Sequence, residues 1–469
     1  MILFKPVLLW TDALIWLLVA GVVFYAWRIR RHEHLVAPWR KVARSRVGMV
    51  SAVVLAAFTA IGLLDSLHLR FSLPQAQNGG ARQYSPEVLS VFDLMATSLR
   101  KHTEKTYSAP FALHLYAKET TELPDGGQAR AFPRLKYGGA HLESPDERLG
   151  DIAVTAAKGV FHGLVLWWGC VLLLVLTLAR RRGIPAGAAW HLIRHGQDDD
   201  LPWRTILTAL GGILLAASAA AALSFHYHIF GTDKVGQDVF YLSLKSIRTG
   251  LVIGTVTTLV MLPFALLLGI AAGYFRGWVD DVIQYLYTTL NSIPGVLLIA
   301  AAVLMLQVYM DGNAEAFDTV NARADMRLLF LCLILGVTSW TGLCRLLRGE
   351  AMKLREADFI QAAAAFGVGH LRIILRHILP NVMHIVLIAV VLDFSGLVLA
   401  EAVLSYVGVG VDPTTQSWGN MINAARLEMA REPMVWWSLA AAFSFMFTLV
   451  LAANLFADSV RDAFDPRMK

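Results

Sequence analysis

Charged residues and cysteines are both scarce in this sequence. Asp, Glu, Lys and Arg make up 16% of the 469 residues whereas 56% are hydrophobic, a balance that argues against an ordinary soluble globular protein. The 3 cysteines, Cys170, Cys332 and Cys344, lie in or beside apolar runs and show no paired spacing. We therefore expect neither a disulfide framework nor a thiolate metal site, and we interpret all of them as buried small hydrophobic residues.

A complete phosphate-binding loop is also missing. Gly231 and Gly236 have the spacing that begins such a loop, but Gln237 and Asp238 stand where Lys and Ser or Thr are required. Because an acidic residue there would repel phosphate, we expect a turn followed by a capped helix, with Asp233 near its start. The sequence thus predicts no nucleotide cofactor, no metal site and no ATP hydrolysis by this chain.

Long apolar runs are abundant instead. Nine of them are long enough to cross a bilayer, whose hydrocarbon core is spanned by about 20 helical residues. They cover residues 7–27, 47–66, 159–179, 205–224, 250–273, 285–308, 328–346, 382–403 and 435–457. The first run has no small-residue cleavage site and is followed by basic residues, so we interpret it as a retained helix rather than a signal peptide. The predicted fold class is an all-α integral membrane protein.

Basic residues predict the orientation of these runs. Residues 28–46 carry seven Lys or Arg against one acidic residue, and Arg180–Arg182 follow the third run. Because loops rich in Lys and Arg stay in the cytoplasm, we expect the N-terminus outside and the C-terminus in the cytoplasm, together with residues 347–381. Cytoplasmic loops then explain the net charge of +6, and we do not expect a nucleic-acid partner.

The spacing of the runs divides the chain into four predicted parts. Residues 1–66 hold two N-terminal transmembrane helices, and residues 67–158 form an extracytoplasmic insertion rich in turn residues. Residues 159–204 hold a third helix and a cytoplasmic linker, whose polar run at 197–202 marks a boundary. Residues 205–469 hold six closely spaced runs, which we interpret as a core with a cytoplasmic loop.

That cytoplasmic loop, residues 347–381, is the most informative polar segment. Residues 352–366 are strong helix formers, and Gly367 then breaks the helix. A second helical stretch begins near His370 and is expected to end at Pro380, since proline disfavours helical geometry in the residue before it. The residues alone allow two readings: a protrusion that docks on a partner protein, or a helix pair that rests on lipid headgroups.

The loop also resembles a known motif. The similarity is carried by Glu356-Ala357-Asp358-Phe359-Ile360-Gln361-Ala362-Ala363, by Gly367 and by Arg376-His377-Ile378-Leu379-Pro380-Asn381. These residues are similar to the coupling loop of ABC importer permeases, and more narrowly to the second permease of dipeptide, oligopeptide and nickel importers. The resemblance implies that Glu356, Ala357, Gln361, Ala362, Ala363 and Gly367 couple this chain to an ATPase. Gln361 departs from the motif, which has Glu at that position.

Further matches to the same family follow in chain order over residues 205–469. They lie at residues 230–239, 292–294, 400–405, 416–421 and 461–467. The resemblance implies a six-helix ABC permease core preceded by a three-helix extension with an external insertion. It also implies the partners, which are a second permease subunit, cytoplasmic ATPase subunits that hold ATP and Mg²⁺, an extracytoplasmic substrate-binding protein and the lipid bilayer.

The implied function is import of peptides across the bacterial inner membrane, driven by ATP hydrolysis on separate subunits. One alternative is a permease for nickel or another small solute. A second is an ion-coupled secondary transporter that uses Asp393 and Glu401 as ion carriers, although a structured cytoplasmic loop is then unexplained. A third is a scaffold that anchors an ATPase without transporting anything.

Polar residues within the apolar runs suggest a translocation path. Asp393 and Glu401 lie eight residues apart in the eighth run and hence roughly on one helix face. Asn291 and Pro294 break the sixth run, and freed backbone is tolerated only against protein or water. We therefore take these four residues as path candidates, while helix–helix hydrogen bonds or a wet position at the membrane edge would also explain them.

Overall fold

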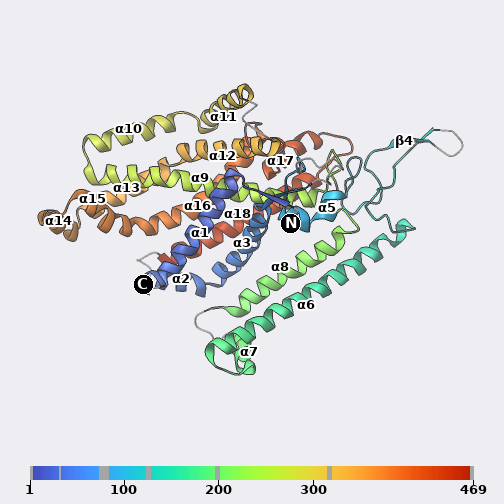
Figure 1. The fold of residues 1–469 in the computed structure, drawn as a ribbon, viewed down its shortest axis with the longest axis horizontal. Coiled ribbons are helices and arrows are strands. Elements are labelled where there is room, and N and C mark those ends of the chain that lie inside the picture. Colours follow the sequence, from blue (N-terminus) through green and yellow to red (C-terminus); the bar gives the residue numbers. More distant parts are fainter. Residues whose placement is uncertain are drawn as a thin grey trace, which may run out of the picture. The chain divides into compact units, whose positions relative to one another are not determined.

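The computed structural model describes residues 4–30, 33–72, 84–122, 128–195, 201–313 and 319–464. Within these residues, nine helical segments are long and apolar enough to cross a membrane. They are Trp10–Arg28, Arg46–Asp65, Pro145–Arg182, Trp203–Ser224, Val239–Phe275, Gly295–Gly312, Val320–Arg355, His370–Tyr406 and Trp437–Phe464. The predicted all-α membrane fold is confirmed, and the strands in Figure 1 are few and short.

Contacts divide the chain into two compact units. Unit 1 comprises Met1–Val7, Trp39–Arg248 and Gln416–Phe456. Unit 2 comprises Leu8–Pro38, Thr249–Thr415 and Ala457–Lys469. Three helices therefore supply residues to both units: α2 (Glu33–Arg44), α9 (Val239–Phe275) and α18 (Trp437–Phe464). The predicted division at residues 66, 158 and 204 stays a prediction, and residues 197–200 of the predicted linker lie outside the described residues.

Unit 1 combines membrane helices with short irregular elements. Its longer helices are α3 (Arg46–Asp65), α6 (Arg148–Arg182), α7 (Ala186–His195), α8 (Trp203–Ser224) and α17 (Trp418–Glu428). Its short elements are β1 (Phe4–Val7), β2 (His68–Phe71), β3 (Leu89–Ser90), α4 (Val91–Met95), α5 (Thr97–Lys101), β4 (Glu119–Glu122), β5 (Gln128–Ala131) and η1 (Pro145–Glu147). Strands β1, β2 and β3 form one antiparallel sheet in that order, and β4 pairs with β5.

The hairpin of α6 and α8 in unit 1 is built on small residues. A Cβ on Gly159 would lie 2.7 Å from Ala219 Cα, and a Cβ on Gly163 would lie 3.0 Å from Leu215 Cα. The residue numbers of these contacts increase along α6 and decrease along α8, so the two helices run antiparallel (Figure 1). Small residues that allow close backbone approach are typical of helix packing in membranes.

Unit 2 contains the elements around residues 347–381, the loop predicted to be cytoplasmic. Its helices, besides the parts of α2, α9 and α18, are α1 (Trp10–Ile29), α10 (Trp278–Ser292), α11 (Gly295–Gly312), α12 (Val320–Ser339), α13 (Thr341–Arg355), α14 (Asp358–Ala365), α15 (His370–Ile373) and α16 (Leu379–Tyr406), with a π-helical turn, η3 (Ile374–Ile378), between the last two. One apolar core joins α9, α10, α13, α14 and α16 around buried residues such as Met261, Leu347 and Ile378. This core fixes the position of the short helix α14.

The sixth predicted run, residues 285–308, is two helices rather than one. Helix α10 ends at Ser292, Ile293 is extended at φ −90° and ψ 129°, and α11 begins at Gly295. Pro294 causes the break because it lacks an N–H and disfavours helical geometry in Ile293. The break predicted at Asn291 and Pro294 is therefore confirmed, and the segment of membrane length is α11 rather than the whole of residues 285–308.

The cysteines follow the prediction in two cases of three. Cys332 and Cys344 are buried and have free thiols. Cys170 is exposed, because it lies on an outward face of α6, so its expected burial was wrong. Among the described residues, no group of three or more His, Cys, Asp or Glu side chains could hold a metal ion.

Candidate functional site

Helix α14 is set apart from the helix that precedes it. The single helix expected over residues 352–366 was wrong: α13 continues to Arg355, and Ala357 is extended at φ −70° and ψ 139° before α14 begins at Asp358. Helix propensity alone favours one continuous helix, but the bend lets Ile360, only 2% exposed, pack into the core of unit 2. Tertiary burial therefore overrides propensity here.

The C-terminus of α14 is a Schellman motif. Gly367 has φ +76°, its N–H donates to Ala364 O, and the Val368 N–H donates to Ala363 O, each at 3.0 Å. Ala363 and Val368 also pack against the same apolar core. Only glycine adopts this left-handed backbone without strain, so the predicted break at Gly367 is explained by its conformation.

The expected helix end at Pro380 was wrong. The chain stays helical from His370 through η3 into α16, and Pro380 lies in the first turn of α16. Proline clashes with the carbonyl four residues earlier in a regular α-helix, and the wider π-helical turn before it relieves that clash. The Asn381 side chain caps the His377 carbonyl, with Nδ2–H donating at 2.6 Å.

The C-terminal end of α9 contacts the chain on both sides of α14. Before α14, Arg276 Nη2 lies 2.6 Å from Glu356 Oε1. After α14, the Tyr274 hydroxyl lies 2.8 Å from His370 Nδ1. A hollow of about 440 Å³ lies between these two contacts and is lined by Tyr274, Glu356 and His370, together with Ile360 and Gln361. The Arg276–Glu356 pair is largely exposed and contributes little energy, so burial of Ile360 and the Tyr274–His370 hydrogen bond are the contacts that fix α14.

The hydrogen bond that Gln361 makes explains why glutamine replaces the motif's glutamate at this position. Its Nε2–H donates to the Glu356 carbonyl oxygen at 3.1 Å, and that carbonyl follows the last turn of α13. Carbonyls at a helix C-terminus need donors from outside the helix. A glutamate at 361 could not donate, and its charge would face the negative end of the α13 dipole. The amide is thus suited to this bend.

Helix α14 presents apolar side chains outward. Phe366 is 88% exposed, and Phe359, Leu371 and Leu375 are also exposed in and after α14. Ala362 is exposed beside them, whereas Ala363 is half-buried. We call Phe359, Ala362 and Phe366 the α14 apolar surface. Exposed aromatic residues beside small ones are typical of protein interaction sites.

Two further contacts fasten the helices behind α14. The Arg348 guanidinium donates from Nε to Asp280 Oδ1 and from Nη2 to Asp280 Oδ2, both at 2.6 Å, and joins α13 to α10. This fork holds the pKa of Asp280 below its usual range. The Arg345 guanidinium lies 6.0 Å from the centroid of the Tyr287 ring, again from α13 to α10.

The four path candidates lie in two places of unit 2. Asn291 accepts a hydrogen bond from the Thr341 hydroxyl at 3.2 Å, and Pro294 is exposed at the start of α11. Glu401 is 2% exposed and accepts a hydrogen bond from the Ser405 hydroxyl at 2.7 Å, so it is not at a solvent-exposed position. Asp393 is half-buried on the same helix, α16. A shared translocation path for these residues stays a prediction.

The turn at residues 231–238 packs against the insertion in unit 1. A Cβ on Gly236 would lie 1.9 Å from the Glu104 carbonyl oxygen, and a Cβ on Gly231 would lie 2.2 Å from that of Ser108. Asp238 caps α9 by accepting the N–H groups of Phe240 and Tyr241 at 2.8 and 3.1 Å. The predicted turn and capped helix are present, but the cap is Asp238, whereas Asp233 accepts N–H groups within the turn.

His228 links this turn to the insertion through two carboxylates, a contact that the sequence did not predict. Its Nδ1 lies 2.7 Å from Asp238 Oδ2, and its Nε2 lies 3.4 Å from Glu104 Oε1. Burial alone would lower the pKa of His228, but these hydrogen bonds raise it to about 9. Glu104 also accepts three backbone N–H groups from residues 136–138, and its pKa falls to about 2 despite burial.

We expect unit 1 to lose stability as the pH rises from about 6.5 to about 9. The pKa of His228 is raised to about 9 in the folded chain, so its contribution is complete below the unfolded value of 6.5 and disappears as pH passes the folded value. The loss amounts to roughly 3 kcal/mol. Thermal unfolding and proteolysis of residues 84–122 in purified protein, measured across this pH range, test it.

The matched variants for this prediction are His228→Gln and His162→Gln. The first removes the charge switch and should flatten the pH dependence, whereas His162 is exposed on α6 and its substitution should leave the wild-type profile. A pH profile that His228→Gln does not alter would show that other groups carry the effect.

Comparison with known proteins identifies the family of this chain. Residues 265–469 match the family described as "Binding-protein-dependent transport system inner membrane component". The oligopeptide transport system permease protein OppC of Mycobacterium tuberculosis (strain ATCC 25618 / H37Rv) is 31% identical over 239 residues, which cover 51% of this chain and 76% of that protein.

Two other relatives have similar coverage. The dipeptide transport system permease protein DppC of Alkalihalophilus pseudofirmus is 33% identical over 52% of this chain and 73% of its own length. The glutathione transport system permease protein GsiD of Pectobacterium atrosepticum is 31% identical over 52% of this chain and 73% of its own length. The predicted family is confirmed: this chain belongs to the membrane permeases of binding-protein-dependent ABC importers.

Proposed function

We propose that this chain is the permease subunit of a peptide importer and that a cytoplasmic ATPase subunit binds the α14 apolar surface. The observation that carries the proposal is the presentation of α14, fixed by buried Ile360 and by the contacts of Tyr274 and Arg276 while Phe366 stays 88% exposed. A helix that merely rested on lipid would not need this bracing. The peptide cargo is supported by the relatives, which are oligopeptide and dipeptide transport permeases.

The proposed assembly contains four kinds of protein. This chain pairs with a second permease subunit in the bacterial inner membrane, and ATPase subunits in the cytoplasm hold ATP and Mg²⁺. An extracytoplasmic substrate-binding protein delivers the cargo on the other side. The basic loop at 28–46 supports an N-terminus outside and a C-terminus in the cytoplasm.

The proposed mechanism is a two-state switch of the helices attached to α14. ATP binding to the partner displaces α14, and the contacts of Arg276 and Tyr274 transmit that displacement to α9. The two hydrogen bonds between Arg348 and Asp280 transmit this displacement from α13 to α10 and to the helix break at Pro294. ATP and cargo are coupled to the extent that each favours the same state of these helices.

We expect Phe366→Ser to weaken binding of the ATPase subunit by about 30-fold, since an exposed aromatic anchor contributes about 2 kcal/mol to an interface. Phe366 makes no core contact among the described residues, so thermal stability should not change. Equilibrium binding of the ATPase subunit to the purified chain in nanodiscs measures the loss, and ATP-driven uptake in proteoliposomes should fall with it.

Val320→Ser supplies the matched control. Val320 is 66% exposed at the start of α12, so it has comparable exposure without belonging to the α14 apolar surface. Its substitution should leave ATPase binding unchanged. Full binding and uptake by Phe366→Ser would contradict the docking role, and uptake that persists without ATP but stops with the proton gradient would contradict the importer itself.

A further inference from the structure

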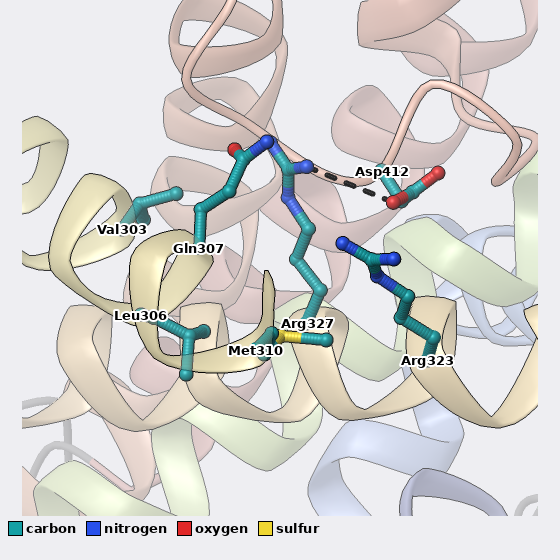
Figure 2. A pocket seen from close by; sticks show the side chains of 7 residues that line it. All are labelled: Val303, Leu306, Gln307, Met310, Arg323, Arg327 and Asp412. Carbon is teal, nitrogen blue, oxygen red and sulfur yellow. Dashed lines mark ion pairs between the residues drawn. The ribbon is translucent and has the colours of Figure 1, made fainter. Parts of the chain in front are cut away.

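A small cavity in unit 2 lies between α11, α12 and the loop that follows α16 (Figure 2). Its polar lining consists of Gln307, Arg323, Arg327 and Asp412, and its apolar wall is formed by side chains of α11. Its volume of about 10 Å³ is enough for one water molecule, so a carboxylate could enter only when the Asp412 carboxylate moves out. The cavity is at the opposite end of the α12–α13 helix pair from α14, since Arg323 lies near the start of α12 and α13 ends at Arg355.

The Arg327 guanidinium is incompletely paired. Its side chain is 13% exposed, and Nη1 lies 3.6 Å from Asp412 Oδ2. Its Nε is buried and has no hydrogen-bond partner in the described structure. Arg348, in the same unit, is fully paired by comparison: its Nε and Nη2 donate to the two carboxylate oxygens of Asp280, each at 2.6 Å. Arg327 therefore keeps an unused donor that a carboxylate would satisfy.

Asp412 cannot complete that fork. Its Oδ1 already accepts the Thr414 N–H at 2.9 Å and the Thr414 hydroxyl at 2.7 Å. Its Oδ2 faces Arg327 Nη1 at 3.6 Å, a distance too long for a hydrogen bond. An incoming carboxylate with two free oxygens would therefore bind Arg327 in a better geometry than Asp412 does.

Arg323 adds a second cation one turn away. It precedes Arg327 by four residues, which places both side chains on one face of α12, and Figure 2 shows both guanidinium groups directed toward Asp412. Its present partner is Asp311, whose side chain is 54% exposed. An ion pair with an exposed carboxylate contributes little to stability, so Arg323 can exchange Asp311 for another anion at little cost.

We infer that Arg327, Arg323 and Gln307 bind the C-terminal carboxylate of a peptide cargo, and that Asp412 holds this place when cargo is absent. The inference rests on the proposed peptide import and adds a specificity determinant to it. A peptide carboxylate is ionised at neutral pH, since the pKa of such groups is about 3.5. Arginine supplies the planar donor fork, and the Gln307 carboxamide supplies a further donor at the cavity wall.

The test compares wild-type and variant transporters, reconstituted with all partner subunits and one binding protein. The probes are trialanine, trialanine amide and Ala-Glu-Ala amide. For Arg327→Gln we expect the KM for trialanine to rise about tenfold, because a charged two-point contact is lost. The KM for trialanine amide should stay within about twofold, since a neutral amide gains little from the fork. The shared binding protein cancels in each variant-to-wild-type ratio.

Further variants separate recognition from stability. Arg323→Gln, on a more exposed side chain, should raise the KM for trialanine alone by about threefold. Arg327→Lys keeps the charge without the fork and should fall between wild type and Arg327→Gln. Arg181→Gln, an exposed arginine at the end of α6, is the control and should behave as wild type.

Each other outcome overturns the inference in a distinguishable way. Equal losses for trialanine and its amide would show a structural role for Arg327, and no loss for either would show no role in recognition. An equal loss for Ala-Glu-Ala amide and trialanine would assign the arginines to side-chain carboxylates instead of the C-terminus. A wild-type complex that imports no peptide would overturn the proposed function and this inference with it.

Discussion

Replacing Gly273 with leucine should separate α9 from α13 and destabilise unit 2 by roughly 3 kcal/mol. A Cβ at this position would lie 2.5 Å from the Arg348 carbonyl oxygen and 2.6 Å from Ala351 Cβ. A backbone oxygen cannot move aside without the whole helix, so the added side chain has to displace α13. Gly269 lies one turn earlier on the same face, and a Cβ there would lie 2.8 Å from the Cys344 carbonyl oxygen.

This contact is a small-xxx-small interface between two membrane helices. Gly273 is followed closely in the sequence by Tyr274 and Arg276, whose side chains contact His370 and Glu356 on either side of α14. The leucine variant should therefore lose both thermal stability, by at least about 5 °C, and binding of the ATPase subunit. Differential scanning of the purified chain and the nanodisc binding measurement report these two effects separately.

Gly212→Leu is the matched control for Gly273→Leu. Gly212 also lies within a membrane helix, α8, but a Cβ there would have no neighbour within 4 Å. Its substitution should leave stability unchanged, while Gly273→Ala should be intermediate. An unchanged melting temperature for Gly273→Leu would show that α9 and α13 tolerate separation and that the glycines do not set their spacing.

Replacing Lys245 with methionine should destabilise unit 1 by about 3–5 kcal/mol. Lys245 Nζ lies 2.7 Å from Asp65 Oδ1 and 2.9 Å from Asp93 Oδ1, and both carboxylates are buried. Burial alone would raise the pKa of Asp93, but the ammonium group of Lys245 and the Ser90 N–H hold it below its usual value. Without the cation, two buried negative charges would face each other.

The three charged residues come from separate parts of the sequence. Asp65 ends α3, Asp93 lies in α4 of the insertion, and Lys245 belongs to the first turns of α9. The methionine variant should therefore loosen the insertion as well as lower the melting temperature. Limited proteolysis of residues 84–122, followed by mass spectrometry, detects the loosening directly.

Neutralising the acids provides the internal control for Lys245→Met. Adding Asp65→Asn and Asp93→Asn removes the uncompensated charges, so the triple variant should recover part of the lost stability. Lys158→Met, at an exposed lysine of α6, should have no effect. If Lys245→Met melts no lower than Lys158→Met, the buried cluster contributes nothing to the fold.

Several features of the site were predictable because they are local. Proline at 294 and glycine at 367 interrupt helices through their own backbone preferences, and the structure shows breaks at both. Apolar runs of membrane length follow directly from composition, so the nine spans were predictable, whereas the family was predictable from the motif at residues 356–367. The same local rules misled at residues 352–366 and at Pro380. There a buried isoleucine and a π-helical turn decided the outcome.

The sequence by itself determined the membrane class, the number of apolar segments long enough to cross a membrane and the position of the motif at residues 356–367. Only the tertiary structure decided what holds that segment, how Gln361 replaces the motif's glutamate and which charges are buried together. Arg276 and Glu356 are 80 positions apart, and Lys245 and Asp65 are 180 apart. Hydropathy and turn preferences act over a few residues, whereas pairing between distant charges depends on how the helices pack, and no local pattern encodes it.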